Sequence, residues 1–583
     1  MRSASGRGID VERRTLDDAA MRALFAATPA ALVTFALATA VHAADRVQPH
    51  PDIAVGHKLI AYTGPRFLTG EPFMAEAHTV IVDETGRVRA LLKGLPPPGQ
   101  YQEQTLPGAL AVAGLHDAHI HLQGVGQARD QVALLGATSP AEVKARVAAW
   151  TSNNPKAAAV RGRGWDQSLF PGQAWPTAKD LEGAGALPIL LERIDGHAAW
   201  ANTALMTLAG IDKGTKDPAG GKILRDALGE PMGVFIDNAI DLVAHKMPAP
   251  SAGDLERWLI EGLHACADVG LVAVHDMGMS VAASKVLMRL DDAQQLPLRV
   301  FVYLDGSDPA AYEILGTRPA SERLSIVGVK LYADGAMGSR GAALLEGYAD
   351  DTGNKGLLLT EPGELRKRIT RVHDKGYAAA VHAIGDRGNR VVLDAMKASP
   401  APAGVRDRVE HAQLVHPSDF SRFALQHVVA SMQPTHATSD MRWAQQRLGA
   451  ERVKGAYAWR TMLDKGAVLA FGSDAPVENE RPQWGIYAAL TRQDSEGAPA
   501  GGFLPEQKLT QAEALAAFAA GAAYAVGREQ HLGALTPGMF FDVTLFSDDA
   551  AQQSEAGNAK AWLRTKPVGT VVGGVLRQTR NQR

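Results

Sequence analysis

Residues 114–122 read GLHDAHIHL, an apolar run that ends in two histidines separated by one isoleucine. In a β-strand, side chains two positions apart leave the same face, so His119 and His121 should point the same way. Two imidazoles held this close can bind one metal ion. The chain has 18 histidines, so such a pair also arises by chance and needs partners elsewhere in the chain.

The composition of the 583-residue chain is that of a globular protein, with 46% apolar and 21% charged residues. Its formal net charge of −3 gives no electrostatic footprint for nucleic acid, and we expect no such partner. The single cysteine, Cys266, excludes a disulfide framework and a thiolate metal cluster. The composition leaves the oligomeric state open, a homodimer included.

The first 43 residues are expected to be a leader. From Met21, which is a candidate for the true start, a short basic segment precedes an apolar stretch that ends in Val41-His42-Ala43, a small-residue cleavage pattern. We therefore expect a cleaved signal peptide, a periplasmic or secreted mature protein and no stable membrane span after cleavage. The twin arginines Arg13-Arg14 leave the export route open.

From about residue 250 onward, short apolar runs alternate with helix-like stretches, which is typical of repeated βα units around a parallel sheet. Together with the first run there are eight candidate strands, the number that closes a (β/α)8 barrel. They read AVAGLHDAHIHL, LVAVHDMG, LRVFVYL, IVGVKLYADG, YAAAVHAIGD, DRVEHAQLV, HVVASMQPTHA and AVLAFGSDAP. The sequence thus predicts an α/β fold with a TIM-like barrel over residues 114–535.

Seven of these strands carry polar or ionisable residues at their C-terminal ends. The C-terminal strand ends of such a barrel form the mouth of the active site, so these groups are expected to converge there. They are His119 and His121, His275 and Asp276, Lys330 and Asp334, His382 and Asp386, Glu410 and His411, Gln433 and His436, and Ser473 and Asp474.

Two parts of the chain do not fit the barrel pattern. Residues 44–113 and 536–583 contain period-two apolar stretches around glycine and proline turns, and we expect them to pair into one small β-sandwich. The interval from about 123 to 255 is far longer than a βα loop. It is therefore expected to be a subdomain inserted after the first barrel strand.

The predicted barrel brings together enough side chains for a metal site, because zinc and similar ions bind neutral imidazoles and carboxylates. The candidates are His119, His121, Lys330, His382, His411 and Asp474. A protonated lysine repels a cation, so Lys330 can be a ligand only if its charge is removed. Carboxylation by carbon dioxide would make it a carbamate able to bridge two ions. The alternative is a one-ion site in which Lys330 pairs with Asp334 or another carboxylate.

Five segments, in this order, resemble motifs of the amidohydrolase superfamily of metal-dependent hydrolases: GLHDAHIHL, VKLYADGAMGSRGAAL, AAVHAIGDRGN, RVEHAQL and LAFGSDAPVE. Two further segments, GRGWDQSLFPG and LERIDGHAAWANTAL, make the chain similar to the branch called amidohydrolase family 3, which includes N-substituted formamide deformylase. The resemblance extends from about residue 50 to the end.

The resemblance implies two divalent metal ions, with zinc as the expected metal. His119 and His121 would hold the first ion, His382 and His411 would hold the second, and the Lys330 carbamate would bridge them. Asp474 would bind the first ion and take a proton from the nucleophilic water. His197, in the inserted region, would hydrogen-bond the substrate; its alternative role is a satisfied structural histidine. His116 stands where an aliphatic residue is common and is either packed or a partner of the ligands.

The implied activity is hydrolysis of a non-peptide, amide-type carbon–nitrogen bond in a small molecule by a metal-activated hydroxide. Asp474 would act first as general base and then as general acid. The alternatives are a catalytically silent metal- or ligand-binding protein on the same scaffold, an esterase, and a hydrolase of N-acyl amino acids or cyclic amides. A silent relative needs no proton carrier, so the acid at the end of the eighth strand favours an enzyme.

Overall fold

The structure is a computed structural model that describes residues 58–70, 76–96, 101–155, 157–194, 196, 198–218, 221–248 and 251–580. All of these belong to one compact unit, Ala54–Arg583. The expected leader and His197 lie outside the described residues.

Eight parallel strands form one sheet whose order follows the chain. The strands are β8 (Leu115–Ile120), β15 (Leu271–Met279), β16 (Arg299–Asp305), β17 (Leu324–Tyr332), β18 (Ala378–Ala383), β19 (Arg408–His411), β20 (Val429–Met432) and β21 (Leu469–Phe471). Two backbone hydrogen bonds join the C-terminal end of β8 to the segment that follows β21: Asp474 N donates to His119 O at 2.7 Å, and His121 N donates to Ala475 O at 2.9 Å. The predicted TIM-like barrel is confirmed.

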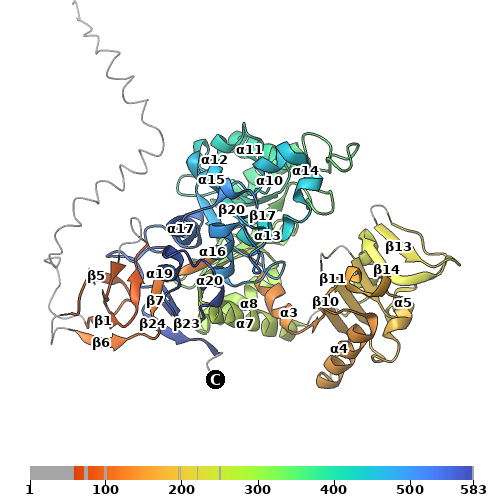
Figure 1. Cartoon of the computed structure of the whole chain (residues 1–583), viewed down its shortest axis with the longest axis horizontal. Coiled ribbons are helices and arrows are strands. Elements are labelled where there is room, and N and C mark those ends of the chain that lie inside the picture. Colours follow the sequence, from red (N-terminus) through yellow and green to blue (C-terminus); the bar gives the residue numbers. More distant parts are fainter. Residues whose placement is uncertain are drawn as a thin grey trace, which may run out of the picture. The chain divides into compact units, whose positions relative to one another are not determined.

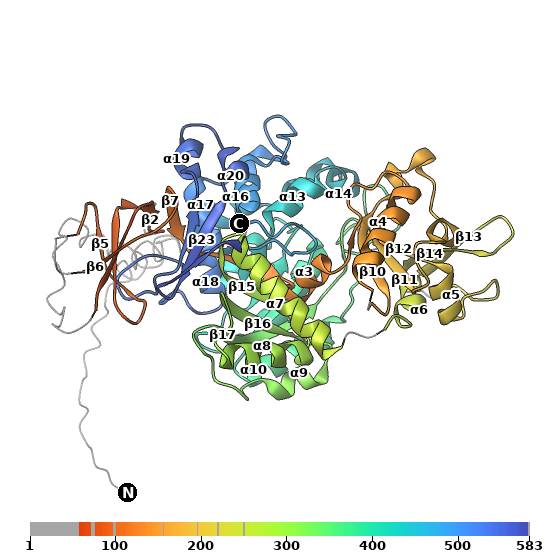
Figure 2. The same ribbon diagram turned by 90° about the horizontal axis from the view of Figure 1, so that it is seen from below.

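Amphipathic helices cover the outside of these strands (Figures 1 and 2). They include α7 (Ala252–Asp268), α8 (Val281–Asp292), α9 (Pro309–Ile314), α10 (Pro362–Asp374), α11 (Asp386–Ala398), α12 (Phe420–Leu425), α15 (Trp459–Asp464), α17 (Gln511–Phe518) and α18 (Ala520–Ala525). Helix α7 shows why they form: Ser251 and Asp254 cap its first turn reciprocally, and Leu259, Leu263 and Cys266 recur on one buried face. In the described part of the chain, no helix is long and apolar enough to cross a bilayer.

Strands from both ends of the chain share one sheet, in the order β24-β23-β22-β7-β2-β3. These are β2 (Arg66–Leu68), β3 (Glu76–Ala77), β7 (Leu110–Ala113), β22 (Val543–Phe546), β23 (Pro567–Val572) and β24 (Val575–Gln578). A second sheet contains β1 (Ile60–Thr63), β4 (Thr79–Val82), β5 (Val88–Leu92) and β6 (Gln102–Thr105). Tyr62, Val80, Phe541 and Val543 belong to a common apolar core, so the two sheets pack as layers.

The segment between β8 and β15 contains a six-stranded sheet of its own. Its strands are β9 (Val132–Ala133), β10 (Val160–Trp165), β11 (Ile189–Arg193), β12 (Ala198–Ala201), β13 (Gly221–Arg225) and β14 (Pro231–Asp237). Helices α4 (Pro140–Asn153) and α5 (Thr203–Ala209) belong to the same segment. Trp165 and Trp200 lie in one apolar core and Phe235 in another, so the insertion has cores separate from that of the barrel.

Candidate metal centre

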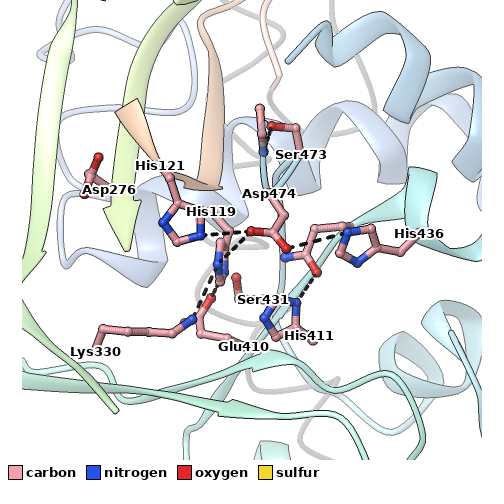
Figure 3. Close-up of polar contacts among 12 residues, drawn as sticks. His119, His121, Asp276, Lys330, Glu410, His411, Ser431, His436, Ser473 and Asp474 are labelled. Carbon is pink, nitrogen blue, oxygen red and sulfur yellow. Dashed lines mark hydrogen bonds and ion pairs between the residues drawn. The ribbon is translucent and has the colours of Figure 1, made fainter. Parts of the chain in front are cut away.

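A cluster of buried imidazoles and one carboxylate lies at the C-terminal ends of the barrel strands (Figure 3). His119 is in β8, His411 ends β19, and Asp474 follows β21 by three residues. One potential ligand atom from each of these three residues lies within 4.8 Å of the other two. Strands that are far apart in the sequence therefore bring these groups together, as expected at the mouth of a barrel.

Asp474 lies at the centre of the cluster. Its Oδ1 is 3.1 Å from Nε2 of His121 and 3.4 Å from Nε2 of His119, so the pair at i and i+2 faces one carboxylate oxygen. Burial raises the pKa of Asp474, but the electrostatic interaction with the His119 ring and the hydrogen bond with His121 outweigh burial and lower the pKa well below its ordinary value. The carboxylate is therefore ionised at neutral pH.

Hydrogen bonds from other side chains fix the orientation of two histidines. His119 Nδ1 lies 2.6 Å from Oε2 of Glu410, and His411 Nδ1 lies 2.9 Å from Oε1 of Gln433. Both oxygens accept, so each Nδ1 carries the proton and each Nε2 presents a lone pair. A metal-binding histidine usually donates the N–H of its other ring nitrogen to a carboxylate or carbonyl oxygen.

His382 is also held by a hydrogen bond and has an open Nε2. It hydrogen-bonds to the backbone of Gly335, and its Nε2 is buried without a hydrogen-bond partner. Burial lowers the pKa of His382 to about 3 and that of His119 to about 4, and the Lys330 charge adds to both effects. A neutral imidazole that offers the lone pair of Nε2 is a suitable metal ligand, so the residues present fit a divalent ion.

Lys330 reaches the cluster from β17 and is 1% exposed. Its Nζ lies 3.4 Å from Nε2 of His119, and burial lowers its pKa to about 8. Asp334 is not its partner: this buried carboxylate accepts backbone N–H groups of Ala343, Ile384 and Gly385 at 2.8–2.9 Å. The salt-bridge alternative for Lys330 and Asp334 is therefore not the arrangement in the structure.

Two members of the cluster have a backbone conformation that is uncommon for residues other than glycine. The φ angles are +72° at His411 and +62° at Asp474. Such conformations cost about 1–3 kcal/mol and concentrate at functional sites. At the end of β19 the positive φ has a visible effect: regular alternation would turn Glu410 and His411 to opposite faces, yet both lie beside His119.

The chain was then compared with known proteins. The model of the amidohydrolase family matches residues 102–577, which is most of the sequence. The chain belongs to the amidohydrolase family. It is similar to the putative amidohydrolase YtcJ of Bacillus subtilis, with 31% identity over 80% of this chain and 89% of the relative. It is also similar to the N-substituted formamide deformylase of Arthrobacter pascens, with 27% identity over 81% of this chain and 89% of the relative.

Among solved structures, this amidohydrolase resembles an uncharacterized metal-dependent hydrolase from Pyrococcus horikoshii. The TM-score is 0.70 at 26% identity, and the match covers 83% of this chain and 96% of the other. Family and fold together identify this amidohydrolase as a metal-dependent hydrolase that uses a divalent metal.

A second polar layer lies beneath the candidate ligands of this amidohydrolase. We call it the lower layer, and it consists of His116, His275, Arg408 and Glu410, each at most 1% exposed. Arg408 donates to both Glu410 oxygens, at 2.6 and 3.1 Å, and to Nδ1 of His275 at 3.0 Å. His275 Nε2 lies 3.4 Å from Nδ1 of His116. His116 is therefore a packed, hydrogen-bonded histidine that touches no candidate ligand.

Several strand-end residues expected at the mouth have other roles. His275 lies in the lower layer, Asp276 accepts the backbone N–H of Leu122 at 2.7 Å, and Asp386 accepts that of Leu345 at 2.9 Å. Glu410, Gln433 and His436 were expected at the mouth, but their contacts with His119, His411 and Asp474 were not predicted. Their signal was the strand-end pattern, but the pattern does not tell which strand-end side chains meet.

Proposed function

We propose that this amidohydrolase cleaves a non-peptide carbon–nitrogen bond of an amide-type small molecule. The observation that carries the proposal is Asp474: an ionised carboxylate directed at two histidines of the cluster, within a family of metal-dependent hydrolases. The similarity to an N-substituted formamide deformylase supports an amide-type bond as the substrate feature.

In this proposal His119, His121 and Asp474 hold one zinc ion, and His382 and His411 hold a second. When bound, such ions lower the pKa of a coordinated water to about 7 and polarise the substrate carbonyl. Asp474 accepts the proton of the attacking water on a carboxylate oxygen and then delivers it to the leaving nitrogen. His119 and His411 keep their Nε2 atoms on the ions because Glu410 and Gln433 hold the opposite ring nitrogens.

In this proposal Lys330 would carry a carbamate, whose two oxygens could bridge the two ions. A pKa of about 8 leaves part of the amine neutral near neutral pH, and the neutral Nζ can attack carbon dioxide. The Nζ–C bond forms, one proton leaves to solvent, and the product is an anion in place of a cation. Lys330→Ala should lose bound metal and activity, and added short-chain carboxylic acids should restore part of both. Retained activity with about one ion per chain would refute the bridge, and Lys375→Ala, at an exposed lysine, is the control.

A screen of formamides, N-acyl amino acids, cyclic amides and aryl esters with the metal-loaded protein tests the reaction. Turnover of an amide is expected, with loss of 100-fold or more in kcat, at the order of general acid–base effects, for Asp474→Asn. Asparagine tolerates positive φ, so this change keeps the backbone. Asp548→Asn, at an exposed carboxylate, should leave turnover unchanged. Turnover of aryl esters alone would favour the esterase alternative, and no turnover in the metal-loaded protein would favour a silent binding protein.

We also propose export, on the basis of the leader motif at Met21–Ala43. N-terminal sequencing of the mature protein should begin near Ala44. A cytoplasmic protein that keeps its N-terminus would contradict export without bearing on the hydrolase proposal.

A further inference from the structure

His436 lies beside the metal centre without belonging to the proposed ligand set. It is in α13 (Pro434–Asp440), which follows β20 directly, and it is 7% exposed. Its Nε2 lies 3.6 Å from Oδ2 of Asp474. The other oxygen of Asp474 faces His119 and His121, so the carboxylate lies between these two histidines and His436 (Figure 3).

The contacts of His436 place its proton on Nε2. The side-chain amide nitrogen of Gln413 lies 3.3 Å from Nδ1 of His436 and 3.5 Å from a carboxylate oxygen of Asp440. An amide nitrogen only donates, so Nδ1 of His436 is an acceptor. The neutral ring therefore carries its proton on Nε2 and directs it towards Asp474.

The Nε2–H of His436 differs from the N–H groups of a histidine with a purely structural role. His436 Nε2 is buried, and none of the residues that the structure describes forms a hydrogen bond with it. His373, a buried histidine away from the centre, shows the structural alternative, since its Nε2 lies 3.0 Å from Asp407 and its Nδ1 lies 3.5 Å from Ser399. Buried donors in native proteins are almost always paired. Oδ2 of Asp474 is an acceptor 3.6 Å from this Nε2, so a short movement of either side chain would form the hydrogen bond.

We infer that His436 is a positioning residue for Asp474. Its Nε2–H holds Oδ2, and this contact keeps Oδ1 turned towards His119 and His121, where the first ion would bind. The inference rests on the proposed function, because Asp474 is taken there as both ligand and proton carrier. His436 thereby acts on metal affinity and on proton transfer without contacting the substrate.

Replacing His436 by glutamine or by asparagine distinguishes a positioning role of the side chain from a role in packing alone. The amide of His436→Gln reaches the Nε2 position, whereas that of His436→Asn ends near Nδ1 and can keep only the Gln413 contact. The readouts are Co²⁺ affinity, measured by competition with a chelator, the number of Co²⁺ ions per chain, and kcat and KM on whichever substrate the screen yields. His416→Asn is the control, because the ring of His416 hydrogen-bonds to the exposed Ser418, away from the metal centre.

His436→Asn should bind Co²⁺ about tenfold more weakly and lose about tenfold in kcat, with KM and the number of ions unchanged, as for other outer-shell partners. His436→Gln should lie within about threefold of the wild type on the same scale. Equal affinities in all variants would leave His436 a packing residue. Loss of one ion per chain would make it a ligand, and a change in KM alone would make it a substrate contact; each result overturns the inference. If no substrate is found, the proposed reaction fails, while the Co²⁺ affinities still decide the role of His436.

Discussion

The same barrel strands carry two buried polar layers that differ in how their polar atoms are paired. The upper layer contains the candidate ligands His119, His382, His411 and Asp474; the lower layer, as defined above, lies beneath it. In the lower layer, Arg408 binds both oxygens of Glu410 and also donates to His275. In the upper layer, Nε2 of His382 is buried without a partner.

This difference separates a structural network from a binding site. A buried polar atom without a partner costs about 1–3 kcal/mol, and a bound ion would supply the missing contact of His382. The lower layer has its charges paired and serves to orient the upper one, through the bond between Glu410 and His119. Buried histidines are therefore informative about function mainly when a ring nitrogen is left open.

The largest expected effect comes from breaking the lower layer. Glu410→Leu leaves the fully buried Arg408 without its counter-charge, and breaking such a pair costs about 3–5 kcal/mol. Urea unfolding of the metal-free protein, in the presence of a chelator, should show a lower midpoint and a free energy of unfolding that is smaller by that amount. Glu451→Leu, at an exposed carboxylate that pairs only with Lys454, should leave the midpoint in place. An unchanged midpoint in Glu410→Leu would show that the lower layer has no structural role.

The pH dependence of stability comes next in size. The pKa of His382 falls from 6.5 in the unfolded chain to about 3 in the fold because of burial. Between these values the unfolded chain binds a proton that the folded chain excludes, so stability is present above pH 6.5 and is lost as the pH falls. The loss is about 1.4 kcal/mol for each pH unit in this window. Urea midpoints of the metal-free protein at pH 7 and pH 5 should therefore differ less for His382→Leu than for the wild type, and equal differences would contradict the assignment.

The smallest expected effect is His382→Leu at pH 8. An apolar side chain replaces a neutral ring whose Nε2 has no hydrogen-bond partner among the described residues. The free energy of unfolding of the metal-free protein, measured with urea, should therefore change by no more than about 1 kcal/mol. The metal content of the variant should nevertheless fall. A loss of several kcal/mol at this pH would mean that the upper layer, like the lower one, is structural.

The sequence alone predicts the barrel well, because each strand is a short apolar run and seven of the eight runs end in polar or ionisable residues. The common direction of His119 and His121 was also predictable, because residues at i and i+2 of a strand share a face. The bond between His119 and Glu410 was not predictable, because it joins residues 291 positions apart. Neither was the positive φ of His411, which breaks the strand alternation and brings adjacent residues to one side. Strand patterns specify periodicity, whereas these features depend on local backbone geometry and on contacts between strands.

The central claim is that the upper layer binds divalent metal, and elemental analysis of the reconstituted protein tests it most directly. The wild type, the double variant His119→Leu/His411→Leu and the control His416→Leu are each incubated with zinc and bicarbonate, freed of unbound ions and measured for zinc per chain. Two ions per chain are expected in the wild type and the control, and both should be lost in the double variant. A wild type without zinc, or a double variant that retains both ions, would contradict it.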